Sequence, residues 1–297
     1  MRPVSSARLR SRATSSVVGE SVVGEEPRVK VGLTLPSFVE DPEIPLSVAR
    51  AAEDAGLDGV FVYDHLFRDG RGGRRRPALE SVALLGAVAG ATSRIAVGAL
   101  VFRAWLRPAA TLATTIETIA RLAPGRVVTA IGSGDSQSRE ENESFGLGFR
   151  TVAERVGALE AAVRAANDLG ARIWVGGRHP AVRDVAARDA QGWNGWGGDA
   201  DEFGAEAVEM RRMADRPDFD CTWGGLLVIG DDDDDATEKA ARLQASPGTI
   251  VGGPDGVARQ LDAYAAAGAD WVVLGPIDSQ DPANAQRLGA RVQPLLG

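Results

Sequence analysis

The chain has 297 residues, of which 44% are hydrophobic and 25% charged, a balance typical of a soluble globular protein. Its formal net charge is −8, so no general electrostatic attraction to nucleic acid is expected. The single cysteine, Cys221, excludes an intramolecular disulfide, the two histidines argue against a histidine-rich metal centre, and no run approaches the roughly 20 apolar residues of a membrane span. We therefore expect a cytoplasmic protein with no resident metal and no membrane span.

Residues 1–28 differ in composition from the rest of the chain. Four arginines, from Arg2 to Arg12, lie among serines and alanines, and no acidic residue precedes Glu20. This composition resembles that of an organellar transit peptide, but the segment has no clear amphipathic stripe. We predict a disordered extension or an over-long start over residues 1–28, followed by one domain over residues 29–297.

From residue 29 onward, short apolar runs alternate with segments of helical periodicity. Strands are predicted at 29–35, 59–63, 95–102, 127–131, 172–176, 192–196, 221–229 and 271–274. Helices are predicted at 44–55, 78–91, 108–122, 151–169, 180–190, 201–214, 255–267 and 282–296, with a further helix start at the acidic run 231–235. We interpret that run as a helix cap rather than a Ca²⁺ site. Eight strands, each followed by a helix, predict a single-domain (β/α)₈ barrel.

The segment from Arg94 to Asp135 shows this alternation most clearly. A buried strand is followed by Pro108, which opens a helix with apolar residues at helical spacing. Pro124 and Gly125 end that helix, and a second buried strand leads into the loop Gly132-Ser133-Gly134-Asp135. A strand–helix–strand crossover of this kind requires parallel strands.

The same segment carries a resemblance to a known family. Its Arg-x-Pro helix start and Gly-x-Gly loop, with AEDAGLDGVFVYDHL (Ala52 to Leu66) and IWVGGRHP (Ile173 to Pro180), resemble the luciferase-like monooxygenase superfamily. That superfamily includes FMN-dependent monooxygenases and oxidoreductases that use the deazaflavin coenzyme F420. The resemblance covers most of the chain from Val29 and favours the F420-dependent branch.

The sequence departs from the superfamily pattern at two places. Between the helix ending near Leu169 and Ile173 there are almost no residues, whereas many relatives carry a long insertion between strands four and five. Relatives that oxidise a sugar phosphate carry a tryptophan four residues after the histidine that matches His65, whereas this chain has Asp69. Both departures argue against copying a relative's substrate.

Barrel active sites lie at the carboxyl ends of the strands. The second strand ends in Asp64-His65, and an imidazole exchanges protons near neutral pH, so His65 is the first catalytic candidate. A purely structural histidine is the alternative. Asp135 is predicted either as a proton donor or as a loop cap. Further strand-end candidates are Arg103, Trp105, Arg107, Trp193, Trp196 and Gly275.

Two glycine loops are candidate phosphate sites. Gly132, Ser133 and Gly134 allow backbone amides to approach an anion, although a tight turn without ligand has the same pattern. Gly176 and Gly177 expose amides before a helix start, and Arg178 offers a guanidinium, while His179 is assigned to the helix start. The resemblance implies that these loops hold the cofactor's phosphate and that Asp64 and His65 contact the deazaflavin ring. It also implies a non-prolyl cis peptide near Leu100-Val101, against the face of the ring.

The preferred function is therefore hydride transfer between coenzyme F420 and a small organic substrate. One alternative keeps the fold but uses FMN and O₂, as a luciferase-like monooxygenase does. Another is a degenerate barrel that binds a cofactor without turnover, motivated by the missing insertion and by Asp69. The resemblance also implies a homodimer, with the apolar helix 78–91 as the suggested contact, although burial of that helix against the barrel is the competing interpretation.

Overall fold

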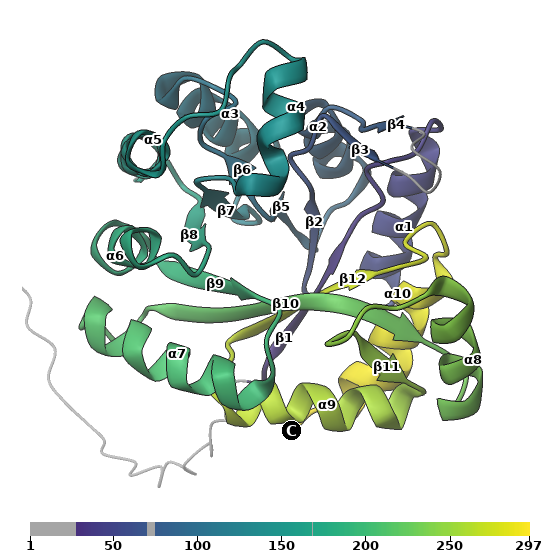
Figure 1. Ribbon diagram of the computed structural model, residues 1–297. Coiled ribbons are helices and arrows are strands. Elements are labelled where there is room, and N and C mark those ends of the chain that lie inside the picture. Colours follow the sequence, from purple (N-terminus) through teal and green to yellow (C-terminus); the bar gives the residue numbers. More distant parts are fainter. Residues whose placement is uncertain (1–27, 70–74, 168) are drawn as a thin grey trace, which may run out of the picture.

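The computed structural model describes residues 28–69, 75–167 and 169–297. The predicted strands are all present: β1 (Lys30–Thr34), β2 (Gly59–Val62), β5 (Ala96–Ala99), β7 (Val128–Gly132), β8 (Arg172–Gly176), β9 (Gly192–Trp196), β10 (Asp220–Ile229) and β12 (Trp271–Pro276). They pair in the order β5-β2-β1-β12-β10-β9-β8-β7-β6, and every pairing along this path is parallel (Figure 1).

The third predicted strand closes the barrel in two pieces. β5 pairs with β2, while the short β6 (Phe102–Arg103) follows a break at Leu100-Val101 and pairs with β7. A parallel bridge between Val97 and Val127 also joins this strand to the start of the next. Because both ends of the strand path belong to one predicted strand, the (β/α)₈ barrel is confirmed.

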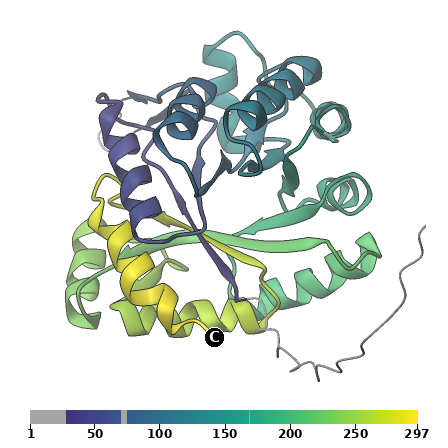
Figure 2. The same ribbon diagram turned by 180° about the vertical axis from the view of Figure 1, so that it is seen from behind.

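Helices surround the strands on the outside (Figures 1 and 2). They are α1 (Glu43–Asp54), α2 (Ser81–Ala91), α3 (Ala109–Leu122), α5 (Val152–Ala166), α6 (Pro180–Asp189), α7 (Ala200–Ala214), α8 (Asp233–Leu243), α9 (Pro254–Ala266) and α10 (Ala283–Arg287). The chain ends in the helical turns η3 (Leu288–Val292) and η4 (Gln293–Leu295), and α10 lies beside α1, so the last helices complete the ring next to the first. Among the described residues, no helix combines the length and apolar character that crossing a membrane requires.

The predicted helix boundaries shift where side chains cap them. α2 begins at Ser81 rather than Ala78, because the Glu80 side chain accepts a hydrogen bond from the amide of Ala83. α5 ends at Ala166 rather than Leu169, and β8 begins at Arg172, so the connection is somewhat longer than predicted but carries no long insertion. The acidic run caps α8 as expected, since the Asp232 side chain accepts from the amide of Asp235.

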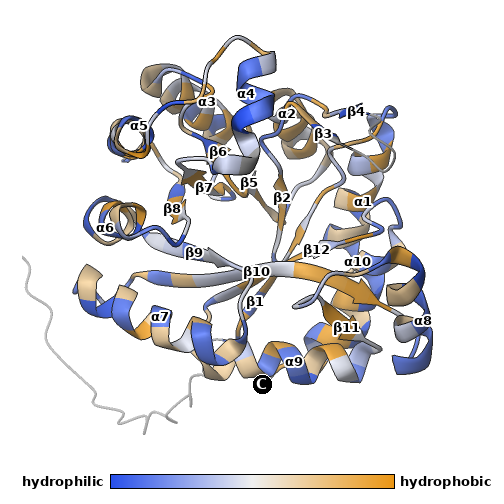
Figure 3. Ribbon diagram, viewed as in Figure 1, coloured by the Kyte–Doolittle hydropathy of each residue, from blue (hydrophilic) through white to orange (hydrophobic). Residues whose placement is uncertain are grey.

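Some elements were not predicted. β3 (Phe67–Asp69) and β4 (Arg75–Pro77) form an antiparallel hairpin after the second barrel strand. The predicted loop 136–149 contains η2 (Ser136–Ser138) and α4 (Arg139–Ser144), and β11 (Ile250–Gly252) extends the sheet beside β10. These elements are short, and the hairpin and α4 are rich in charge, as the hydrophilic colour of α4 in Figure 3 shows, so they carry little apolar periodicity.

The barrel interior has its own aromatic core. Phe61, Trp174 and Trp271 pack together there, with ring centroids 5.5 to 6.0 Å apart, and small residues make room for them. Gly59 is one such residue, since a Cβ atom there would lie 2.9 Å from Trp271 Cζ3. A filled interior leaves the carboxyl ends of the strands as the place for a site.

The predicted extension over residues 1–28 lies outside the described residues, apart from Arg28. The guanidinium of Arg28 forms two hydrogen bonds of 2.9 Å with the carboxylate of Asp58, at the start of β2. The prediction for residues 1–27 therefore stays a prediction.

Candidate active site

A pocket of about 570 Å³ opens at the carboxyl ends of the barrel strands. The residues predicted as catalytic or cofactor-binding line it: Asp64, His65, Leu100, Val101, Gly132, Ser133, Gly134, Asp135, Gly176, Gly177 and Arg178. Its wall also contains residues that the sequence did not single out, namely Phe38, Tyr63, Arg68, Ser138, Val182 and Leu226. The rule that strand ends form the site thus brings segments far apart in sequence to one cavity.

His65 is held at the pocket wall by a buried carboxylate. Its Nδ1 atom lies 3.0 and 3.1 Å from the two carboxylate oxygens of Glu141, on α4. Glu141 also accepts hydrogen bonds from the amides of Leu66 and Phe67, at 3.0 and 3.2 Å, and from Arg103 Nη1 at 2.7 Å. Burial on its own would raise the pKa of Glu141, but the hydrogen bond with His65, the positive charge of Arg103 and the hydrogen bond from the Phe67 amide lower it below its usual value. Glu141 is therefore an ionised acceptor that orients the imidazole.

The Asp64 carboxylate is already saturated with protein partners. It accepts hydrogen bonds from Ser81 Oγ at 2.5 Å, from the amide of Arg103 at 2.9 Å, and from both terminal nitrogens of Arg107, at 2.7 and 3.0 Å. Asp64 is buried, and its backbone oxygen accepts a further bond from Arg103 Nε at 2.6 Å. Asp64 borders the pocket, but its geometry suits holding β2, β6 and α2 together better than binding a ligand.

The peptide bond between Leu100 and Val101 is cis, as the resemblance implied. The side chain of Val101 lies against Gly132 and Gly176 in the pocket wall. A Cβ atom on Gly132 would lie 2.6 Å from Val101 Cγ2, and one on Gly176 would lie 2.5 Å from Val101 Cγ1. These two glycines are thus required by the close approach of Val101 rather than by exposed amides.

The loop after β7 is shaped by two side chains. Asp135 caps η2, since its carboxylate accepts from the amide and the hydroxyl of Ser138, at 3.1 and 3.2 Å. Two roles were predicted for Asp135, proton donor and loop cap, and this contact is that of a loop cap. Arg155, on α5, donates to the carbonyl oxygens of Ser133 and Gly134, which fixes the direction of both peptide groups. Gly134 has φ 70°, a conformation that favours glycine.

In the loop after β8, two groups that were predicted to bind the cofactor's phosphate already have protein partners. The amide of Gly177 is used within the barrel, where it donates to the Asn194 oxygen at 3.1 Å. The Arg178 guanidinium turns toward α7 and pairs with Glu202 at 2.7 Å and Glu206 at 3.2 Å. Arg178 is therefore not the free phosphate donor that was expected, because sequence alone does not reveal these carboxylates. His179 caps α6 as predicted, since its Nδ1 accepts from the Ala181 amide at 3.2 Å.

The three candidate tryptophans divide between scaffold and pocket. Trp193 is fully buried and donates to the Gly177 oxygen at 2.9 Å, so it supports the glycine loop from behind. Trp105 donates to the Leu147 oxygen at 3.2 Å, which is the loop-anchor role. Trp196 is 39% exposed and lines the pocket.

Tyr63 is the clearest residue that the sequence analysis missed. Its hydroxyl donates to Thr34 Oγ1 at 2.9 Å, and its ring lies 6.3 Å from His65 and 6.4 Å from Trp196. Burial raises the pKa of Tyr63, with smaller opposing effects from the Thr34 hydrogen bond and the charge of Arg68. Its position directly before Asp64, at the end of β2, was the available signal.

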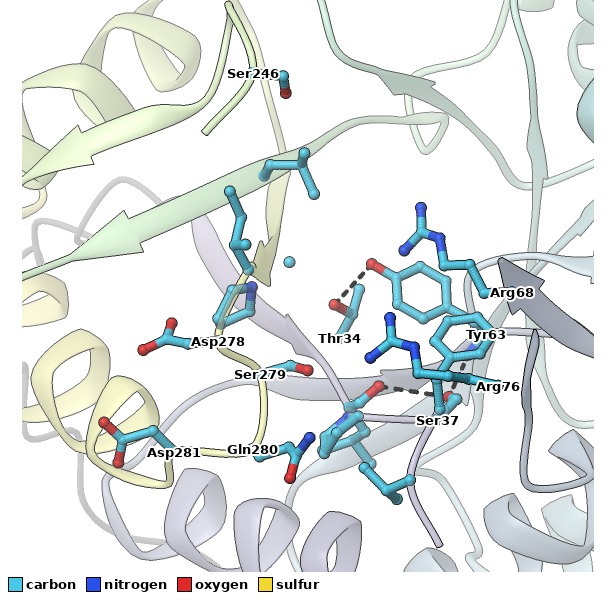
Figure 4. Close-up of a pocket in the computed structure, with 18 of the residues that line it drawn as sticks. Thr34, Ser37, Tyr63, Arg68, Arg76, Ser246, Asp278, Ser279, Gln280 and Asp281 are labelled. Atoms are coloured by element: carbon cyan, nitrogen blue, oxygen red, sulfur yellow. Dashed lines mark hydrogen bonds between the residues drawn. The ribbon is translucent and has the colours of Figure 1, made fainter. Parts of the chain in front are cut away.

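A second pocket, of about 650 Å³, adjoins the first and has Tyr63 in its wall (Figure 4). The two pockets share Phe38, Tyr63, Arg68 and Leu226. Its wall also includes the hairpin residue Arg76 and the segment 275–281 that follows β12. The first pocket is thus lined by the glycine loops, and the second, adjoining pocket is lined largely by polar side chains.

The pocket fits a flavin-type cofactor in several respects. Val101 forms a wall over the glycines, and aromatic rings of Phe38, Tyr63 and Trp196 line another side. Among the described residues, Arg103 Nη2 and Arg178 Nε are buried nitrogens without a hydrogen-bond partner, and both belong to residues that line the pocket. Unpaired buried donors next to a cavity suit an anionic ligand.

Solved structures share the fold. An F420-dependent secondary alcohol dehydrogenase in complex with an F420-acetone adduct aligns with a TM-score of 0.75 at 16% identity, over 90% of this chain and 99% of the other. EDTA monooxygenase from Chelativorans sp. BNC1 aligns with a TM-score of 0.76 at 14% identity, over 90% of this chain and 93% of the other. At these identities the likeness establishes the (β/α)₈ fold alone.

Sequence comparison identifies the family. F420-dependent glucose-6-phosphate dehydrogenase from Beutenbergia cavernae is 33% identical over 151 residues, which are 50% of this chain and 44% of that protein. The same enzyme from Nakamurella multipartita is 30% identical over 153 residues, 51% of this chain and 42% of that protein. These matches span less than half of each relative. The model of the luciferase-like monooxygenase family matches residues 28–248, most of the chain. The protein therefore belongs to the luciferase-like monooxygenase family.

Proposed function

We propose that the protein is an oxidoreductase that transfers a hydride between coenzyme F420 and a small organic substrate. The observation that carries this proposal is the pocket at the strand ends, where His65, Val101 and both glycine loops meet. The two relatives at 33% and 30% identity are F420-dependent glucose-6-phosphate dehydrogenases, which favours F420 over other cofactors.

The imidazole of His65 is arranged to accept a proton. The Glu141 carboxylate is ionised and can only accept, so we assign the ring proton to Nδ1, which lies 3.0 Å from it. The other ring nitrogen, Nε2, is then an acceptor, and the side chain of His65 is 40% exposed on the pocket side of the contact. In the proposed reaction, Nε2 takes the proton of a substrate hydroxyl when the substrate is oxidised, and returns it in the reverse direction.

The cofactor would supply the ring that accepts the hydride, and residues of this chain would form the binding site of that ring. Val101 and the aromatic residues would flank the ring, while the loops at Gly132–Gly134 and Gly176–Arg178 would lie toward its phosphate. Since the Gly177 amide and the two terminal nitrogens of Arg178 are engaged elsewhere, the phosphate would depend on the open backbone of these loops, on Arg103 Nη2 and on Arg178 Nε.

The two alternatives make different demands on the pocket. Use of FMN with O₂ is consistent with the fold, since a riboflavin lyase bound to a modified FMN aligns with a TM-score of 0.72. A barrel that binds a cofactor without turnover is expected to have a blocked, apolar mouth. The mouth here is an open pocket with charged and hydroxyl side chains, which favours an enzyme.

Turnover with variants at His65 tests the proposal. In the oxidation direction, small alcohols are tested as substrates, and the loss of F420 fluorescence measures reduction of the cofactor. In the reverse direction, aldehydes and ketones are tested with reduced F420, and the return of fluorescence is measured. His65→Ala should lower kcat by about 10²–10⁴, the usual contribution of a positioned acid–base group, with little change in F420 affinity. Partial recovery with added imidazole would identify proton transfer as the lost step. Full turnover by His65→Ala would remove His65 from the mechanism.

We also propose a cytoplasmic homodimer, as the family resemblance implied. The suggested contact on α2 is weaker than expected, because Leu84, Leu85 and Val88 are buried within the chain itself. Leu79, just before α2, and Val82, within it, are only partly exposed and pack against the core. A dimer through this surface would thus rest on fewer apolar side chains than the sequence suggested.

A further inference from the structure

Two arginines face the second pocket from the β3–β4 hairpin. Arg68 and Arg76 are directly opposite each other in this antiparallel pair, so their side chains lie on the same face. Both line the 650 Å³ pocket, and Figure 4 shows both guanidinium groups reaching into it beside Tyr63. Like charges placed opposite each other across two strands destabilise the pairing, so this arrangement calls for a compensating negative charge.

Neither arginine has such a charge within the described part of the chain. No carboxylate of the described residues lies within ion-pair distance of Arg68 or Arg76, and the Arg68 guanidinium only lies over the Phe38 ring, 5.5 Å from its centroid. Their neighbour Arg75 shows the contrast. It pairs with Glu140 at 2.6 Å and lies 3.8 Å from the centroid of the Phe67 ring. The two pocket-facing arginines thus keep their hydrogen-bonding capacity for a ligand.

The acids across the pocket do not cancel this charge. Asp278 pairs with Lys239 at 2.7 Å, and Asp281 accepts from the amide of Ala283 at 3.0 Å, with Arg287 at 3.9 Å. Each acid therefore already has a basic neighbour on its own side. The hairpin end of the pocket carries the uncompensated positive charge.

The pocket connects this positive end to the proposed reaction site. Arg68 lines both cavities, and Tyr63 lies between them with its ring 6.3 Å from that of His65. Between the two ends, the wall offers hydroxyl and amide groups, from Thr34, Ser37, Ser279 and Gln280. Such a wall suits a polar molecule that carries an anionic group at one end.

We propose that Arg68 and Arg76 bind the carboxylate or phosphate group of an anionic substrate whose reacting carbon lies near His65. Guanidinium groups form paired hydrogen bonds with both kinds of anion, so the shared chemistry is a small oxyanion on a polar carbon skeleton. This inference rests on the proposed oxidoreductase function, and it assigns the substrate class of the same site. It places the substrate anion on the opposite side of Tyr63 from the glycine loops.

Calorimetric titration of F420-saturated protein with inorganic phosphate, and separately with acetate, tests the proposal. Binding of one or both anions should be saturable, and Arg68→Gln and Arg76→Gln should each weaken it by about 10- to 100-fold, the usual effect of losing a charge-assisted hydrogen bond. The matched control is Arg121→Gln on α3, because that arginine is 77% exposed and pairs with Glu117. Its affinity for the anion should equal that of the wild type. Without anion, the two hairpin variants should melt at or above the wild-type temperature, because a repulsion is removed.

Two results would overturn the assignment. Anion binding that is absent, or equal in the wild type and in both hairpin variants, would show that the arginine pair is not the site. A fall in F420 affinity in these variants would assign the pair to the cofactor instead. If the protein bound no F420 at all, the proposed function would fail, but the same titration on the cofactor-free protein would still show whether the two variants lose anion binding.

Discussion

Replacing Glu141 should destabilise the fold, because its carboxylate holds His65 and Arg103 in place. Glu141 accepts hydrogen bonds from His65, from two backbone amides and from Arg103, and the side chains of Glu141 and Arg103 are each only 6% exposed. Removing one partner of a buried ion pair costs about 3–5 kcal/mol, because the other charge stays buried. Glu141→Ala should lower the free energy of unfolding by that amount. Glu141→Gln should cost less, because its amide oxygen can still accept.

The lowered pKa of Glu141 also predicts how the free energy of unfolding changes with pH. The folded-state pKa of Glu141 lies below its unfolded value of 4.5, since the charged partners outweigh burial. Its contribution is therefore fully present above pH 4.5 and is lost as the pH falls through the lower folded-state pKa. Urea denaturation at pH 7 and near pH 4 measures this, with Glu143→Gln as the control, because Glu143 is exposed on the same helix. A Glu141→Gln variant with the stability and acid sensitivity of the control would refute the reasoning.

Three further predictions concern other parts of the molecule. Gly177→Val should weaken F420 binding by more than about 10-fold, because φ 133° disfavours any side chain and a Cβ would lie 3.3 Å from Val182. The control is Gly148→Val, which also has a positive φ, of 65°, but lies outside the pocket. Equal F420 affinity in the two variants would contradict the placement of the cofactor at Gly177. Burial raises the pKa of the Cys221 thiol to about 12, so iodoacetamide at pH 8 should label it only after unfolding, as mass spectrometry would show. Light scattering at micromolar protein should give twice the chain mass of 31.1 kDa, and the monomer mass would reject the dimer.

The barrel was predictable because its strands are buried on both faces. The run 271–274 is apolar throughout, the run 127–131 is apolar except for the β-branched Thr129, and each is followed by a segment with helical periodicity. The β3–β4 hairpin was not predictable in this way, since its strands are short and arginine-rich and pair through backbone groups. Charge at the hairpin gave no apolar pattern from which to infer a strand.

The site was predictable as a location but not as a network. Strand ends converge in any parallel barrel, so Asp64, His65 and the glycine loops could be assigned to one cavity from their order alone. Glu141 is 76 residues from His65 in the sequence and lies on a helix that the sequence did not predict. The engagement of Arg178 by Glu202 depends in the same way on how the loop after β8 packs against α7. Partner choice of this kind depends on tertiary geometry that no local pattern encodes.

Parallel titration of the purified protein with F420 and with FMN tests the central claim most directly. The pocket at the strand ends should bind F420 with at least a tenfold lower Kd than FMN, and Gly177→Val should reduce the affinity for F420. Fluorescence of each cofactor reports binding without the need for a known substrate. A tenfold preference for FMN would contradict the F420 assignment, and failure to bind either cofactor at high concentration would contradict the account of the pocket as a cofactor site.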